Sequence, residues 1–256
     1  MDRVDWTSWR AVLFDLDGVV TPTAEVHMRA WSEMFNAFLT NDAPTLPDAA
    51  SADLSAYTDA DYFAHVDGKP RYDGVRDFLM SRAILLPEGT SEDPGTELTV
   101  RGLGNRKNDA FNAVLARDGV TAYPGSVELL DHLRELDLPL AVVSSSANAP
   151  AVLAAAGLAD RFRCVVDGRV ATELGLPGKP APDTFLHAAE ALGATAADSV
   201  VLEDAVSGVR AGAAGGFGLV IGVDRGAGPD TLTRAGADLV VADLAELVVP
   251  ATGGAR

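Results

Sequence analysis

Two aspartates two residues apart, Asp15 and Asp17, have the type and spacing of groups that carry out phosphoryl chemistry. They follow the apolar run Ala11–Phe14, which reads as a short buried strand, and Gly18 comes directly after them. Two carboxylates this close repel each other unless a divalent cation lies between them or one stays protonated. Because open α/β sheets bind ligands beyond the carboxyl ends of their strands, we expect a ligand site at this pair.

Further polar groups occupy similar places later in the chain. Ser144 closes an apolar run, and so does the acidic pair Glu203 and Asp204. Lys179 stands between a glycine and a proline, outside any predicted helix. A hydroxyl, a cation and further acids near the first two aspartates would suit the binding of a phosphoryl group and a metal ion.

Length and charge limit the possible functions. The 256 residues suit one large domain or a core with a smaller appended domain, and the net charge is -17. A surface this acidic argues against nucleic acid and against anionic membranes as partners. The single cysteine, Cys164, excludes an intrachain disulfide framework, and no signal peptide or membrane span is visible, so we expect a cytoplasmic protein that acts as a monomer.

Strand-like apolar runs alternate with helical patterns over most of the chain, which predicts an α/β fold. The architecture expected is a three-layer, Rossmann-like parallel-sheet core with right-handed crossovers. The predicted strands are Ala11–Phe14, Leu138–Val143, Arg163–Val166, Ser199–Leu202, Gly218–Val223 and Ala237–Val241. The predicted helices of the core are Val127–Glu135, Ala149–Ala156, Asp183–Leu192 and Val206–Ala214.

Residues 23–120 differ from the rest, because they show helical patterns and no convincing buried strand. The helices predicted there are Ala24–Leu39, Asp59–Val66, Tyr72–Arg82 and Lys107–Arg117. We therefore expect a helical cap domain over 23–120, inserted after the first strand of a core made of 1–22 and 121–256. Pro87–Val100 reads as a long loop that covers the site or binds a partner, and the tail Pro250–Arg256 is predicted to be disordered.

The four polar elements, in this order, resemble the haloacid dehalogenase superfamily of phosphotransferases. The stretches that narrow the resemblance to its β-phosphoglucomutase-like subfamily are Thr21–Trp31, Gly68–Arg71, Arg106–Asp109, Ser144–Asn148 and Lys179–Asp183. That subfamily uses a helical cap and Mg²⁺, and it interconverts β-glucose 1-phosphate and glucose 6-phosphate through a bisphosphate.

The resemblance implies a role for each acid. Asp15 would be the nucleophile that forms an aspartyl phosphate, although a carboxylate at a strand end can also simply cap a turn. Asp17 would be the general acid and base, with its backbone carbonyl on the metal; the alternative is Mg²⁺ ligation by its side chain alone. With Asp15 and Asp17, Glu203 and Asp204 would complete the Mg²⁺ site, and Asp204 could also cap the helix that follows.

Phosphate binding would fall to the serine loop and to one lysine. Ser144 and Lys179 would hold the phosphoryl group in transfer, whereas an isolated lysine is more often a solvated surface residue. Ser145, Ser146 and Asn148 would bind a second phosphate at a helix start, or would simply cap that helix.

The cap would supply specificity. Gly68 and Arg71 match the subfamily's Gly-x-x-Arg element, whose guanidinium can grip a phosphate; Lys107, Trp31 and His27 match substrate-facing cap or hinge positions. Taken alone, Trp31 would more often be a core side chain, and His27 a structural histidine with its hydrogen bonds satisfied.

Two departures from the subfamily remove positive charge. Asp67 stands where a lysine usually precedes Gly-x-x-Arg, and Ala147 stands where a lysine often precedes Asn148. Lys69 is the candidate replacement. The leading interpretation is a sugar-phosphate mutase, and the alternative is a phosphatase of the same superfamily that uses water as acceptor. The intact set of catalytic residues argues against a third function, a non-catalytic sugar-phosphate sensor.

Overall fold

A six-stranded parallel sheet forms the centre of the protein, in the order β3-β2-β1-β4-β5-β6. The computed structural model describes residues 4–248, so the predicted disorder of Pro250–Arg256 lies outside it. The strands are β1 (Ala11–Phe14), β2 (Leu140–Val143), β3 (Cys164–Val166), β4 (Ser199–Glu203), β5 (Leu219–Val223) and β6 (Leu239–Val241). All six predicted strands are present, and this strand order is that of doubly wound α/β proteins.

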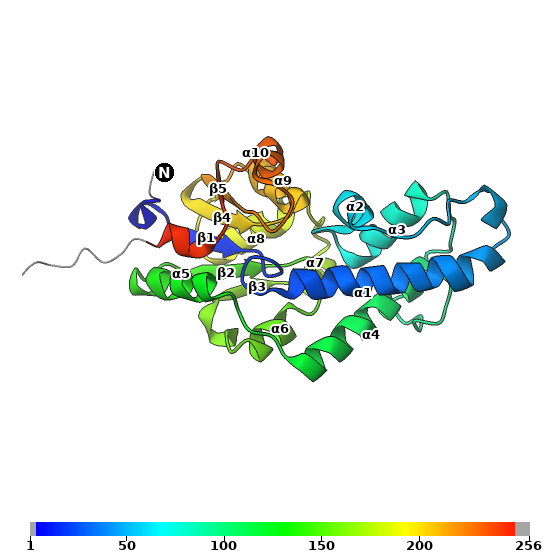
Figure 1. The fold of residues 1–256 in the computed structure, drawn as a ribbon. Coiled ribbons are helices and arrows are strands. Elements are labelled where there is room, and N and C mark those ends of the chain that lie inside the picture. Colours follow the sequence, from blue (N-terminus) through cyan, green and yellow to red (C-terminus); the bar gives the residue numbers. More distant parts are fainter. Residues whose placement is uncertain (1–3, 249–256) are drawn as a thin grey trace, which may run out of the picture.

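Alternate residues of β1 point to opposite faces of the sheet, as the pleat of a strand requires. Val12 and Phe14 belong to one apolar cluster, with the leucines of α5, and Leu13 belongs to the other, with Phe185 of α8. The sheet is therefore the middle of three layers, and the predicted α/β class is confirmed (Figure 1). The helices of this part are α5 (Pro124–Glu135), α6 (Ala149–Ala155), α7 (Gly168–Leu174), α8 (Asp183–Ala191), α9 (Val206–Ala214) and α10 (Pro229–Ala235).

The register of the sheet brings three strand ends together. Phe14, the last residue of β1, pairs with Val142 on one side and Leu202 on the other. The residues that follow these strands therefore meet at one edge, and the backbone N–H of Asp15 donates to the carbonyl of Leu202 at 2.9 Å. The strand order changes direction at β1, because the chain continues to β2 and β3 on one side and to β4, β5 and β6 on the other. Sheets of this kind bind ligands at such a switch point.

The insertion after β1 is helical and has an apolar core of its own. It contains α1 (Thr23–Ala37), α2 (Asp59–Asp61), α3 (Arg71–Ser81) and α4 (Val100–Asp118), with a π-helical turn, Tyr62–Val66, after α2. Phe35, Phe38 and Phe78 are at the centre of a cluster that is separate from the two clusters of the sheet. Figure 1 shows these helices together beyond one edge of the sheet, with α1 running beside α4.

Three helix predictions were incomplete. Helix α4 begins at Val100 rather than at Lys107, because Gly102 and Gly104 lower the helical propensity of its first turns, while the side chain of Thr99 caps it. The short helices α7 and α10 were not predicted at all. The prediction of an irregular Pro87–Val100 segment is confirmed up to the start of α4.

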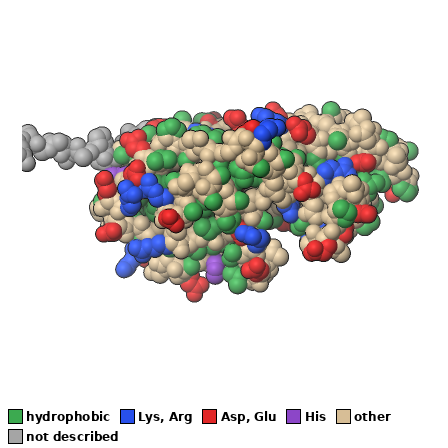
Figure 2. All heavy atoms as spheres, turned by 90° about the horizontal axis from the view of Figure 1, so that it is seen from below, with side chains coloured by type: hydrophobic (Ala, Val, Ile, Leu, Met, Phe, Trp, Pro, Cys, Tyr) green, Lys and Arg blue, Asp and Glu red, His purple; other side chains and the backbone are tan. Residues whose placement is uncertain are grey.

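No helix in the described part of the chain combines the length and the apolarity needed to cross a bilayer. On the face seen in Figure 2, Lys and Arg side chains are scattered among acidic ones rather than gathered in one patch. The cations that matter for the site are buried inside the molecule instead.

Candidate active site

Three carboxylates and one lysine meet at the ends of β1 and β4. Oxygens of Asp15, Glu203 and Asp204 all lie within 4.8 Å of one another. The Nζ of Lys179 donates to Asp15 Oδ1 at 2.6 Å, to Glu203 Oε1 at 2.6 Å and to the carbonyl of Val143 at 2.9 Å. Lys179 is only 3% exposed, so the reading of an isolated surface lysine is wrong.

This cluster carries more negative than positive charge. Burial raises the pKa of Asp15 well above its usual value; Glu203 and Asp17 add to the effect and Lys179 opposes it. Burial likewise raises the pKa of Asp204, with Glu203 adding to it. A divalent cation would relieve both effects, and an all-oxygen donor set fits Mg²⁺.

The two neighbouring acids of β4 differ in their freedom to bind a metal. Both carboxylate oxygens of Glu203 already accept hydrogen bonds, one from Lys179 and one from the N–H of Ala205 at 2.9 Å. Asp204 has no such bond in the described chain and does not cap α9, whose N-cap is Ala205. Its carboxylate lies against Gly18, where a Cβ would come within 1.9 Å of Asp204 Oδ2. Gly18 also has φ +89°, so both the space and the backbone conformation require glycine.

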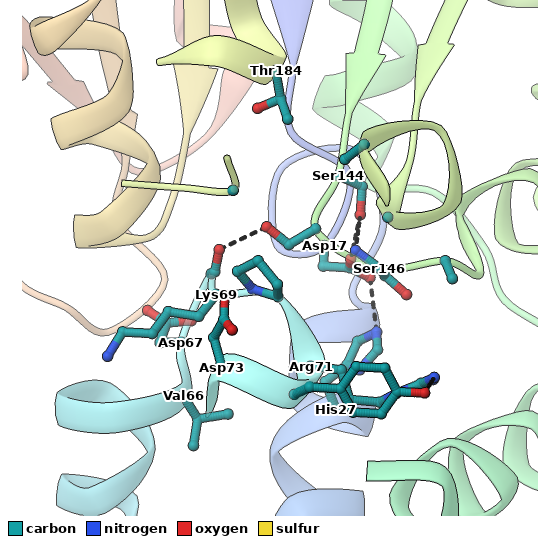
Figure 3. A pocket seen from close by; sticks show the side chains of 18 of the residues that line it. Asp17, His27, Val66, Asp67, Lys69, Arg71, Asp73, Ser144, Ser146 and Thr184 are labelled. Carbon is teal, nitrogen blue, oxygen red and sulfur yellow. Dashed lines mark hydrogen bonds and ion pairs between the residues drawn. The ribbon is translucent and has the colours of Figure 1, made fainter. Parts of the chain in front are cut away.

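Asp17 points away from the acidic cluster, toward the helical insertion. Its carboxylate accepts a short hydrogen bond from the hydroxyl of Thr23 and one of 3.3 Å from Ser144, and Oδ1 lies 3.3 Å from His27 Nε2. Figure 3 shows Asp17 between Ser144 and His27. Burial acts to raise the pKa of Asp17, but His27, Thr23 and Lys107 outweigh it and lower the pKa to about 2. This arrangement does not support ligation of a metal by the Asp17 side chain.

Behind Asp17 lies a buried pair formed by α1 and α4. His27 Nδ1 is hydrogen-bonded to Lys107 Nζ, and the His27 ring stacks on Phe111 with ring centroids 4.0 Å apart. Burial lowers the pKa of His27, and Lys107 lowers it further. Burial also lowers the pKa of Lys107 to about 7, with a contribution from Arg71. An ammonium that donates to Nδ1 would leave the proton of His27 on Nε2, facing Asp17.

The serine loop after β2 is bonded to itself and to the insertion. Ser144 accepts from the N–H of Ser146, and Ser146 accepts from the N–H of Asn148. Ser145 donates to the carbonyl of Gly68 at 2.8 Å, and the amide of Asn148 donates to Asn108 of α4 at 2.8 Å. Asn148 is the N-cap residue of α6 but makes no side-chain capping bond. The side chains of Ser145 and Asn148 thus tie the two parts of the protein together.

The loop before α3 carries the residues expected to set specificity. Ser207 of α9 donates to the carbonyl of Asp67 at 2.9 Å, and a Cβ at Gly68 would come within 2.2 Å of the Ser207 hydroxyl. Burial, with Glu203 adding to it, raises the pKa of Asp67 to about 7. Lys69 lines the cavity, and its ammonium pairs with Asp77 of α3 at 2.6 Å.

A cavity of about 670 Å³ lies between the strand ends and the helical insertion. Asp15, Asp17, Ser144 and Asp204 line it from the sheet, and the expected specificity residues line it from the insertion. These are His27, Trp31, Gly68, Arg71 and Lys107. Trp31 is also a core residue, 4% exposed and stacked on Phe35. Lys179 and Glu203 are not among the residues that line the cavity; Lys179 is hydrogen-bonded to both Asp15 and Glu203.

Sequence reasoning missed several polar groups of the site. Thr23 lies within the Thr21–Trp31 stretch, where its position six residues after Asp17 was a usable signal. Thr184 and Arg169 also line the cavity, from α8 and α7. Asn105 is hydrogen-bonded to Arg71, but the two residues are 34 positions apart and no sequence pattern predicts the contact.

Known proteins resemble this chain in both sequence and fold. The model of the haloacid dehalogenase-like hydrolase family matches residues 9–216. A β-phosphoglucomutase of Mycobacterium bovis is 51% identical over 93% of this chain and 91% of its own length. One from Bacillus subtilis is 30% identical over 94% of this chain and 92% of its own. A crystal structure of the Clostridium difficile β-phosphoglucomutase, 22% identical, has a TM-score of 0.73 and covers 94% of this chain and 93% of that one.

The chain belongs to the haloacid dehalogenase-like hydrolase family. It is an enzyme of the phosphotransferase and isomerase type within that family.

Proposed function

We propose that this protein is a Mg²⁺-dependent β-phosphoglucomutase, which converts β-glucose 1-phosphate to glucose 6-phosphate through an aspartyl phosphate on Asp15. The observation that carries the proposal is the difference between the surroundings of the two aspartates. Asp15 lies in a cluster of acids that a cation would neutralise, and Asp17 faces a histidine, a threonine and a serine instead. One is suited to attack phosphorus and the other to move protons.

In the covalent step, a carboxylate oxygen of Asp15 attacks the phosphorus of a bound phosphate. The bond from phosphorus to the leaving oxygen breaks, and that oxygen takes its proton from Asp17. Lys179 fixes the other oxygen of Asp15, and Ser144, at the end of β2, donates to the phosphoryl group as charge develops. Glu203 also accepts a hydrogen bond from Lys179. Removal of Glu203 or of Lys179 would therefore leave a buried charge uncompensated.

Transfer to the sugar requires Asp17 in its base form first. Its pKa of about 2 keeps it ionised at neutral pH, ready to take the proton from the 6-hydroxyl of β-glucose 1-phosphate. The hydroxyl oxygen then bonds to the phosphorus of the aspartyl phosphate, and Asp15 is released. When the bisphosphate binds again in the opposite sense, the proton now on Asp17 returns to the leaving O1, and glucose 6-phosphate results.

Asp15 and Asp204 would hold the Mg²⁺, with the backbone carbonyl of Asp17 that the family resemblance implies. When bound, the cation offsets the repulsion between a carboxylate nucleophile and a dianionic phosphate. Glu203 would stay behind them, because its oxygens are occupied.

The helical insertion would decide the acceptor. We propose that 23–120 forms a cap on a core of 1–22 and 121–256, and that the bonds of Ser145 and Ser207 to the Asp67–Gly68 backbone hold it closed. A closed cap excludes water and favours a sugar hydroxyl as acceptor. Arg71 would hold the phosphate that is not in transfer, with Ser146 and Asn148 on the opposite wall. The cytoplasm and a monomeric state stay predictions from the sequence.

A product assay tests the proposal. The protein is incubated with β-glucose 1-phosphate, Mg²⁺ and a trace of glucose 1,6-bisphosphate. We expect glucose 6-phosphate without a matching release of inorganic phosphate, and no turnover in Asp15→Asn. Stoichiometric inorganic phosphate would instead establish the phosphatase, and no product across a panel of sugar phosphates would favour the sensor.

A further inference from the structure

Arg71 is held on one side only. Its Nη2 donates to the hydroxyl of Tyr72 at 3.0 Å and to Asn105 Oδ1 at 3.3 Å. Its Nε is buried and has no hydrogen-bond partner within residues 4–248. Because the side chain lines the cavity, this unpaired donor is available to an anion bound there.

Tyr72 is fixed in place beside Arg71. Its hydroxyl donates to Asn105 Oδ1 at 2.8 Å, so Arg71 and Tyr72 share one acceptor. The guanidinium carbons of Arg71 and Arg101 lie 4.8 Å and 4.7 Å from the centroid of the Tyr72 ring. Gly104 makes room for this ring, since a Cβ there would come within 2.7 Å of Tyr72 Cδ1.

Asn105 joins this group to the long irregular segment before α4. Its Nδ2 donates to the carbonyl of Ser91 at 3.1 Å and to that of Asp93 at 2.9 Å. The start of the same segment is anchored by Glu88, which accepts from Arg76 at 2.8 Å and from Arg101 at 3.1 Å. The side-chain amide of Asn105 thus connects two parts of the insertion. Its oxygen accepts from Arg71 and Tyr72, and its nitrogen donates to the Pro87–Val100 segment.

We propose that Asn105 is a positioning residue, which locks Arg71 to the Pro87–Val100 segment and so determines how tightly the non-transferring phosphate of a sugar phosphate binds. The inference rests on the proposed function for the identity of the ligand, and deepens it. Ser91 brings the segment to the wall of the cavity, which Tyr72 and Arg101 also line.

The charges around the cavity explain why such a lock is needed. Asp67 and Ala147 leave these two loop positions without a positive charge, and Lys69 is paired with Asp77. Arg76 and Arg101 are also paired, with Glu88. Arg71, by contrast, has a buried Nε with no partner within residues 4–248, and a guanidinium that is already oriented loses less conformational freedom when it binds the second phosphate.

The experiment compares a ligand that reaches Arg71 with one that does not. Glucose 6-phosphate binding is measured by calorimetry with Asp15→Asn, which cannot be phosphorylated, and with the same variant carrying Asn105→Leu. In the Asp15 enzyme, acetyl phosphate supplies a phosphoryl group to Asp15 without a distant phosphate, and release of inorganic phosphate is followed. We expect Asn105→Leu to weaken glucose 6-phosphate binding about tenfold, as for loss of a hydrogen bond to a charged group. Its rate with acetyl phosphate stays unchanged.

The control is Asn112→Leu, the same substitution at an exposed position on the same helix, which should change neither measurement. Tyr72→Phe removes one of the two partners of Arg71 and keeps the ring; it should weaken binding in the same direction, and serves if Asn105→Leu does not fold. Binding within twofold of the parent would overturn the inference. So would an equal loss with acetyl phosphate, which would mark Asn105 as merely structural.

Failure of the proposed function would look different. An enzyme that makes no glucose 6-phosphate from β-glucose 1-phosphate, yet binds glucose 6-phosphate in a way that depends on Asn105, would refute the mutase and retain the positioning role.

Discussion

Replacing Lys179 by methionine tests the buried charge cluster on which the proposed chemistry depends. The substitution keeps most of the side-chain volume and removes three hydrogen bonds, to Asp15, Glu203 and the carbonyl of Val143. It leaves two buried carboxylates without their counter-charge. Breaking one side of such a buried pair costs about 3–5 kcal/mol of unfolding free energy. Loss of the preorganised cation that is hydrogen-bonded to the nucleophile Asp15 should also lower kcat by about a hundredfold to a thousandfold.

Lys69 offers a matched control, because its Nζ lies 2.6 Å from Asp77, the same distance as between Lys179 and Asp15. The Asp77 side chain is 44% exposed, whereas that of Asp15 is 10% exposed. Lys69→Met should therefore cost no more than about 1 kcal/mol. Urea unfolding of both variants gives the comparison directly.

The pH dependence gives a second measure of the same effect. Asp15 and Glu203 raise the pKa of Lys179 above its usual 10.5, so its stabilising effect is fully present below that pH and constant between pH 5 and 8. Without Lys179 the raised pKa of Asp15 rises further. The native variant then binds a proton that the unfolded chain does not, so its stability falls as pH rises from 5 to 8 more steeply than that of the wild type.

A background with neutral partners completes the test. In Asp15→Asn combined with Glu203→Gln, no buried carboxylate remains for Lys179 to compensate, and Lys179→Met should cost far less than in the wild type. The reasoning is refuted if Lys179→Met costs no more than Lys69→Met, or if its cost is the same at pH 5 and pH 8 and in both backgrounds.

Three further substitutions examine other parts of the site. Gly18→Ala places a methyl group against the Asp204 carboxylate and costs about 1–2 kcal/mol in backbone strain. Mg²⁺ affinity, measured by calorimetry, should fall at least about tenfold. An affinity equal to that of the wild type would contradict the role of Asp204. The pKa of Lys107 is about 7 in the folded protein and 10.5 in the unfolded chain, so between these pH values the unfolded chain binds a proton that the folded protein lacks. The stability of the wild type should therefore rise by about 2 kcal/mol from pH 7 to 9, and Lys107→Met should lack this rise. Asp17→Asn should bind glucose 6-phosphate normally and still form the aspartyl phosphate on Asp15 from acetyl phosphate, whose leaving group needs no proton, while sugar-phosphate turnover falls about a hundredfold or more. Parallel loss with both substrates would assign Asp17 a structural role.

The core of the site was predictable from the sequence because the polar residues there directly follow apolar runs. A parallel sheet brings consecutive strand ends to one edge, so Asp15, Ser144 and Asp204 had to meet once their strands were recognised. Lys179 was identified from a motif rather than from physics, since a lysine between glycine and proline gives no sign of being buried.

The specificity region could not be predicted as far. The first two turns of α4 were not predicted, because glycines lower their helical propensity. The position of Asn105, which the helix brings next to Arg71, was therefore not predicted either. The side-chain directions of Asp17 and Lys69 depend on partners from other helices, His27 and Asp77. Such contacts arise from packing between segments far apart in the chain, and no local pattern records them.

The central claim is that the phosphoryl group moves from Asp15 to a sugar hydroxyl and not to water. Turnover of β-glucose 1-phosphate in water labelled with heavy oxygen, with Mg²⁺ and a trace of glucose 1,6-bisphosphate, tests it most directly. Mass spectrometry should find glucose 6-phosphate whose phosphoryl group carries no label, and almost no inorganic phosphate. Labelled inorganic phosphate in amounts that match the substrate consumed would contradict the account.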